Sequence, residues 1–136
     1  MNYWLIKSEP GCYSWQQMQS DKVTEWDGVR NYQARNNMIA MRLGDLAFFY
    51  HSITGKQIVG IVKVVKEHYA DPDDPSGKFC LVDFECQESL QNPVTLVQIK
   101  EDEALSNIAL VKQSRLSVMP ITEAEWNRIT EISTQN

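Results

Sequence analysis

The sequence is poor in the residues that build disulfide frameworks and metal centres. It has three cysteines and two histidines in 136 residues, and no CxxC pair. If Cys80 and Cys86 share a strand, they lie about 20 Å apart at about 3.3 Å per residue, too far for a disulfide. His51 and His68 have no zinc-ligand spacing relative to the cysteines. We therefore expect no metal, and a reducing compartment, either the cytoplasm or the nucleus of a eukaryote.

The sequence also lacks the features that mark membrane proteins and common enzyme classes. No apolar run approaches the length of a membrane span, and the first residues do not combine a basic start with a signal-peptide core. It contains no GxSxG, no phosphate-binding glycine loop and no HExxH. We expect no membrane anchor, no cofactor and no catalysis. Glu9 and Asp27 can be imagined as paired carboxylates, but no pattern in the sequence shows that they meet.

Positive charge is scarce overall, with 13 Lys and Arg against 18 Asp and Glu and a net charge of −5. A protein that coats nucleic acid through bulk electrostatics needs many phosphate contacts, so this balance argues against that class. The distribution is uneven, because the only charged residues in 28–44 are Arg30, Arg35 and Arg42. A local basic patch on an acidic protein favours a pocket that reads one nucleotide over a groove that follows a long duplex.

Length and composition predict one globular domain spanning residues 1–136, with 43% hydrophobic and 23% charged residues. Hydrophobic periodicity predicts strands at residues 2–7, 46–51, 57–67, 79–87 and 116–119. Helices are expected at residues 14–20 and 31–41, as a helical turn from Thr95, through the stripe Leu105, Ile108 and Val111, and through the stripe Trp126, Ile129 and Ile132. Capping boxes are expected at Ser14–Gln17, Thr95–Gln98 and Thr122–Glu125.

The order of these elements indicates an α+β fold. Three consecutive strands favour an antiparallel meander, and the first and last strands must be inserted beside it. A small curved sheet or partial barrel braced by helices is the expected result, with residues 71–77 forming an acidic surface loop. No exposed apolar stripe demands a dimer, so we expect a monomer.

Residues 26–36, called here the arginine segment, have the least core-like composition of the chain. The segment joins an aromatic residue, an Asp-Gly turn, two arginines and several amides. Asn31 is placed to cap the following helix. Guanidinium forks and side-chain amides recognise the edges of planar ligands, whereas aromatic rings recognise their faces. We therefore expect the arginine segment to form one wall of a recognition pocket.

Four stretches, residues 2–10, 26–36, 49–52 and 114–118, resemble the signatures of the EVE domain, a branch of the PUA-like superfamily. The resemblance implies a small PUA-like mixed β-barrel with helices around it. EVE domains are similar to the YTH readers of methylated adenine, and members have been linked to modified cytosines in DNA or modified bases in RNA. It therefore implies a non-catalytic module whose partner is DNA or RNA carrying a modified base.

Carried over position by position, the resemblance implies a nucleobase pocket formed by Lys7, Ser8, Trp26, Arg30, Asn31, Tyr32, Arg35, Tyr50, His51, Ser114, Arg115 and Leu116. Residues 71–79 depart from the family pattern, so the resemblance assigns no role in nucleic-acid contacts to this loop.

Each of these assignments has an alternative. Trp26 and Tyr32 can stack on a flipped base or belong to the core. Arg30 and Arg35 can bind a phosphate or base edge, or form structural ion pairs. Arg115 can bind a phosphate or simply lie at a helix C-terminus.

The remaining alternatives concern His51 and the function as a whole. His51, with Tyr50, can bind a ligand or be satisfied internally at a strand end. The whole protein can instead be an enzyme or enzyme subunit acting on a nucleotide or small anionic metabolite. A third reading is a protein-interaction module whose basic patch docks an acidic partner.

Overall fold

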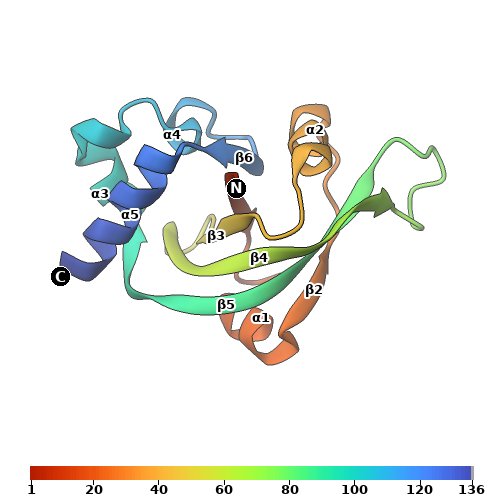
Figure 1. Ribbon diagram of the computed structural model, residues 1–136, viewed down its shortest axis with the longest axis horizontal. Helices are drawn as coiled ribbons and strands as arrows, with labels where there is room; N and C mark the ends of the chain where they lie inside the picture. Colours follow the sequence, from red (N-terminus) through yellow and green to blue (C-terminus); the bar gives the residue numbers. More distant parts are fainter. Residues whose placement is uncertain (136) are drawn as a thin grey trace.

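A computed structural model describes residues 1–135, which form a strongly curved, six-stranded mixed sheet (Figure 1). The strand order is β2-β5-β4-β3-β1-β6, and only the β1–β3 pair is parallel. The strands are β1 (Tyr3–Ser8), β2 (Val23–Trp26), β3 (Leu46–His51), β4 (Gln57–Ala70), β5 (Cys80–Thr95) and β6 (Val118–Ile121). The meander of β3, β4 and β5 and the insertion of β1 and β6 beside it confirm the expected architecture. Within residues 1–135 the edge strands β2 and β6 do not pair, so the barrel stays open.

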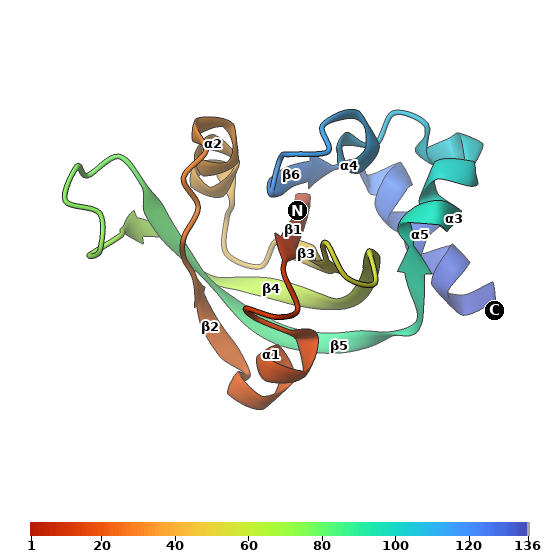
Figure 2. The ribbon, with the colours of Figure 1, turned by 180° about the vertical axis from the view of Figure 1, so that it is seen from behind.

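The helices cover the two ends and sides of this sheet. They are α1 (Trp15–Asp21), α2 (Tyr32–Ala40), α3 (Leu96–Glu101), the 3-10 turn η1 (Glu103–Leu105), α4 (Ala109–Lys112) and α5 (Glu123–Gln135). In both views α3, α4 and α5 gather at one end of the molecule, and the β4–β5 loop projects from the other (Figures 1 and 2). Helices α1 and α2 lie on opposite sides of the β4–β5 ribbon. None of the helices in residues 1–135 is both long and apolar enough to cross a bilayer.

Local capping signals placed the helix starts correctly. The Asn31 side chain accepts a hydrogen bond from the Ala34 amide at the start of α2. Thr95 and Gln98 form the complete capping box of α3. Before α5 the corresponding reciprocal pair is present, because the Thr122 amide donates to the Glu125 carboxylate and the Glu125 amide to the Thr122 hydroxyl. These bonds satisfy backbone donors that a helix start otherwise leaves without partners.

The core lies between the sheet and the helices. Leu5 and Ile6 from β1 and Phe48 and Phe49 from β3 are fully buried, as is Phe84 from β5. Strand β1 pairs with strands on both sides and buries residues of both parities, which confirms the prediction of a strand covered on both faces.

The structure differs from the expected elements in three places. Strand β2 was not predicted, because its four residues bury only Trp26 and carry little periodic signal. The last strand was expected to end at residue 119, but β6 continues through Pro120 to Ile121, because an edge position tolerates the missing amide donor of proline. The expected helix through Leu105, Ile108 and Val111 is broken into η1 and α4.

Candidate functional site

The arginine segment runs from the last residue of β2 into α2, and most of its residues are exposed, whereas Trp26, Val29 and Ala34 are buried. It leaves β2 at Trp26 and turns at Gly28, whose φ of +74° is a conformation that glycine adopts without strain. Val29 is buried and anchors the turn. Asn31 then caps α2, so its amide oxygen is used for folding. This path leaves Trp26 and Arg30 beside a hollow.

This hollow, the Trp26 cavity, has a volume of about 600 Å³, within the usual range for small-molecule pockets. Its walls come from the end of β1, the loop that follows it, β2, the arginine segment and the turn before β6. They consist of Lys7, Ser8, Glu9, Cys12, Tyr13, Thr24, Glu25, Trp26, Asp27, Gly28, Val29, Arg30 and Ser117. Of the predicted pocket residues, the structure brings Lys7, Ser8, Trp26 and Arg30 together here.

Trp26 combines the two roles that the sequence left open, a place in the core and a place on the wall of a binding site. The side chain is 8% exposed and packs edge-on with Phe49 and Phe84, with ring planes at 82° and 88°. Tyr13 meets it in the same edge-on manner at 6.3 Å. The indole is therefore part of the core and also an apolar wall of the cavity.

The charged groups in the Trp26 cavity are of both signs. Lys7 and Arg30 lie on its wall with three carboxylates, Glu9, Glu25 and Asp27. The Lys7 Nζ donates to the Ser114 carbonyl oxygen at 2.8 Å, and burial lowers the pKa of this ammonium. The cavity therefore offers both hydrogen-bond donors and acceptors to a planar guest.

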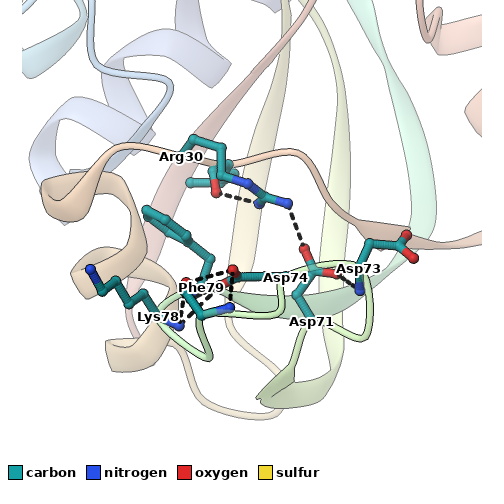
Figure 3. Close-up of polar contacts among 8 residues, drawn as sticks. Arg30, Asp71, Asp73, Asp74, Lys78 and Phe79 are labelled. Atoms are coloured by element: carbon teal, nitrogen blue, oxygen red, sulfur yellow. Dashed lines mark hydrogen bonds and ion pairs between the residues drawn. The ribbon is translucent and has the colours of Figure 1, made fainter.

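Arg30 is held from three sides (Figure 3). Its guanidinium donates to the Val29 carbonyl oxygen at 2.9 Å and to Asp71 Oδ2 at 3.2 Å, and its Cζ lies 5.2 Å from the centre of the Phe79 ring. The Asp71 carboxylate is almost fully buried and also accepts from the Asp73 amide. The structural ion pair expected as the alternative is therefore present. The Arg30 side chain remains 45% exposed on the cavity wall, so the pair does not exclude a ligand.

Tyr32 and Arg35 lie outside the Trp26 cavity, in a stack of planar groups beside it. Tyr32 is 51% exposed, and its ring stacks on that of Phe79 with the ring centres 5.4 Å apart. The Arg35 guanidinium carbon Cζ lies 4.9 Å from the centre of the Tyr32 ring. Arg35 also donates to the Lys78 carbonyl oxygen at 3.1 Å. The β4–β5 loop thus holds the arginine segment, although no local pattern in the sequence connects the two.

Two further cavities take up most of the other predicted residues. The Tyr50 cavity, about 410 Å³, is lined by Lys7, Tyr50, Ser52, Ile53, Lys56, Leu96, Leu110 and Ser114. The Arg115 cavity, about 370 Å³, is lined by Asn31, Gln33, Lys112, Gln113, Ser114, Arg115 and Leu116. Lys7 belongs to both the Trp26 and Tyr50 cavities, and Ser114 to both the Tyr50 and Arg115 cavities.

His51 lines none of these three cavities. Its Nε2 accepts a hydrogen bond from the Trp15 amide at 2.9 Å, and burial lowers its pKa, so the ring acts as a neutral acceptor. This is the internally satisfied histidine that was the alternative to a ligand contact. No group of three or more His, Cys, Asp or Glu in residues 1–135 is arranged to hold a metal ion.

The family of this fold is settled by comparison with known proteins. A family model described as EVE domain matches residues 2–132. The chain belongs to the EVE domain family. The resemblance seen in the sequence is thereby confirmed, and the matched region includes all of the cavity walls described above.

Relatives of this EVE domain are known from bacteria and vertebrates. A protein from Rhodopseudomonas palustris solved by NMR is 47% identical, covers 98% of this chain and 93% of its own, and has a TM-score of 0.93. Chicken thymocyte nuclear protein 1 is 35% identical over 96% of this chain and 68% of its own length. The crystal structure of human THYN1 in complex with 5-methylcytosine containing DNA is 31% identical, covers 100% of this chain and 99% of that one, and has a TM-score of 0.92.

Part of the Trp26 cavity of this EVE domain was not predicted from the sequence. Thr24 and Glu25 lie on the unpredicted strand β2, and Ser117 precedes the short strand β6. Glu9 and Asp27 lay within the motifs already singled out but were considered only as a catalytic pair. Their position after a strand end and in an Asp-Gly turn was the available signal.

Proposed function

We propose that the protein is a non-catalytic reader that binds a modified nucleobase, 5-methylcytosine or a base of similar shape, in the Trp26 cavity. The observation that carries the proposal is the cavity itself, which combines an aromatic wall with donors and acceptors of both charges. The complex of human THYN1 with 5-methylcytosine containing DNA supports it, because that fold matches this one over its whole length.

The chemistry of cytosine fits the Trp26 cavity. Its exocyclic amino group is a donor that carboxylates accept, and Glu9, Glu25 and Asp27 supply such acceptors. Its carbonyl oxygen O2 and ring nitrogen N3 are acceptors for an arginine or lysine. A 5-methyl group needs an apolar contact, which Trp26 or Val29 provides. A base in this position must leave the helical stack, as in other proteins that read a flipped base.

The test is a binding titration with matched oligonucleotides that contain cytosine, 5-methylcytosine, adenine or N6-methyladenine. Wild-type protein is expected to bind one modified base more tightly than its unmodified form. Arg30→Ala is expected to weaken that binding, since the guanidinium lies on the cavity wall. Equal binding to all of the oligonucleotides, or to none, contradicts the proposal.

A second candidate has one observation in its favour. Glu9 and Asp27 line the same cavity, so the paired carboxylates imagined from the sequence share one space. An enzyme that acts on the bound nucleotide would use them for proton transfer. Incubating the modified oligonucleotide with excess protein and analysing its nucleosides by mass spectrometry separates the two candidates. A reader leaves the nucleosides unchanged, and an enzyme alters them.

The proposal also covers the cellular location of the protein. A cytoplasmic location, or a nuclear one in a eukaryotic cell, agrees with the three free cysteines and with the nuclear name of the vertebrate relatives.

A further inference from the structure

The Tyr50 cavity contains the hydroxyl group of an otherwise buried side chain, and no protein group within residues 1–135 uses it. Tyr50 is 3% exposed, and its hydroxyl makes no hydrogen bond to any residue in 1–135. Every fully buried side-chain oxygen and nitrogen in that range has a partner, so the Tyr50 hydroxyl must still reach the cavity. Burial raises the pKa of this phenol, which keeps it a neutral donor. A donor that faces a cavity without a protein partner is free to bind an acceptor on a ligand.

The charges around the Tyr50 cavity have one sign. Lys7 from β1 and Lys56 from the turn before β4 line it, and none of its described lining residues is an acid. Lys7 uses one of its three ammonium donors on the Ser114 carbonyl oxygen, and the other two remain available. The contrast with the Trp26 cavity, where three carboxylates face two cations, is sharp. The Tyr50 cavity suits an anion.

Part of the remaining wall is apolar, and it includes a strained residue. Leu96, Leu110 and Ile53 line the Tyr50 cavity, and they offer a surface for the carbon face of a sugar. Ile53 is 66% exposed and has a φ of +66°. A β-branched residue rarely adopts this conformation, and strain of this kind concentrates at ligand-binding sites.

Lys7 connects this cavity with the proposed base site, because it lines both. We propose that the Tyr50 cavity binds a phosphate group, and that this phosphate belongs to the nucleotide whose base enters the Trp26 cavity. The phosphate accepts from the Tyr50 hydroxyl, Lys7 and Lys56, and the sugar lies against the apolar wall. The link to the base rests on the function proposed above; the phosphate site does not.

The experiment uses two variants that preserve the fold and one control. Tyr50→Phe removes the hydroxyl and keeps the buried ring. Lys56→Gln removes an exposed charge from the cavity, and Lys63→Gln removes an equal charge whose nearest acid is Glu85, 3.9 Å away. Each protein is titrated with an oligonucleotide carrying 5-methylcytosine, and with the same oligonucleotide carrying a neutral methylphosphonate next to the modified base.

Wild type and Lys63→Gln are expected to lose about tenfold in affinity with the neutral linkage, the effect of one charge-assisted hydrogen bond. Tyr50→Phe and Lys56→Gln are expected to bind the normal oligonucleotide more weakly and to respond less to the neutral linkage. Lys56→Gln is also expected to lower the salt slope by about 1. If both variants bind like wild type and lose as much affinity with the neutral linkage, the link between this cavity and the base is wrong.

Titrations with inorganic phosphate and with free 5-methyldeoxycytidine monophosphate, followed by NMR, identify the source of the phosphate. Chemical shift changes at the amides of Ile53 and Lys56 that disappear in Lys56→Gln support the phosphate site. They do so even if the protein does not discriminate between oligonucleotides with different bases, a result that would refute only the proposed function. The same shifts without a methylphosphonate effect assign the cavity to a free phosphorylated ligand and overturn its link to the base. The absence of shifts with either compound, together with no methylphosphonate effect, overturns the phosphate site itself.

Discussion

At the scale of single residues, the tightest constraint is the contact of Gly60 with Trp15. A Cβ placed on Gly60 would lie 2.1 Å from Cζ2 of the indole, far inside contact distance. The indole is itself fixed, because its Nε1 donates to the Ser89 hydroxyl at 2.8 Å. The ring therefore has to move and give up this bond if a side chain is added.

We expect Gly60→Ala to lower the free energy of unfolding by about 1–3 kcal/mol, the usual cost of overpacking. Urea denaturation followed by tryptophan fluorescence measures it. Gly11→Ala is the matched control, since no atom lies within 4 Å of its added Cβ and it should change stability by less than about 0.5 kcal/mol. Equal stability of the two variants would contradict the contact.

Asp71 is the residue that decides the position of Arg30. Replacing it in Asp71→Asn removes the charge that holds the guanidinium, and we expect the free energy of unfolding to fall by about 1–2 kcal/mol. Affinity for the modified oligonucleotide should fall as well, because Arg30 is no longer preorganised. Asp73→Asn is the control, since Asp73 contributes only its backbone amide to this cluster. Tighter binding by Asp71→Asn would show that the ion pair masks Arg30.

At the scale of elements, α5 is joined to η1 by an ion pair. The Arg128 guanidinium contacts Asp102 Oδ2 at 2.7 Å and Glu131 at 2.6 Å. Its hydrogen bond to Asp102 holds the pKa of that carboxyl below its ordinary value. Because the folded-state pKa is depressed, this contribution to stability is complete above the unfolded-state pKa and is lost as the pH falls through the folded-state value.

We therefore expect Asp102→Asn to be less stable than wild type at neutral pH, with a difference that shrinks as the pH falls below about 4. Thermal unfolding across a pH series measures this. Asparagine still caps η1, where Asp102 Oδ1 accepts from the Ala104 amide, so the substitution isolates the charge. Arg128→Gln should show the same trend, and a difference independent of pH would refute the role of this pair.

The elements also show how far local reasoning extends. The caps at Asn31, Thr95 and Thr122 were predicted because each depends on residues three positions apart. Strand β2 was missed because it is stable only through its pairing with β5, about sixty residues further along the chain. Such an edge strand carries little signal of its own.

At the scale of the whole molecule, the net charge of −5 sets how the protein meets a polyanion. Without a large positive field, binding depends on a few local contacts around the cavities. We expect the logarithm of the binding constant to fall with the logarithm of salt concentration with a slope no steeper than about −3, which corresponds to about three phosphate contacts. Fluorescence anisotropy at several salt concentrations measures the slope. A much steeper slope would indicate a long basic track that the charge distribution does not predict.

The single-domain organisation and the monomeric state stay predictions.

The sequence by itself determined the order of most elements, the helix caps, the family and the unusual polarity of residues 26–36. These features depend on neighbours a few positions apart, so their signals are local. Only the tertiary structure decided that Arg30 pairs with Asp71, which lies 41 residues away, and that Lys7 joins two cavities. It also divided the predicted pocket residues among separate cavities. A cavity forms where strands and loops distant in the chain converge, and neither periodicity nor residue type encodes that convergence locally.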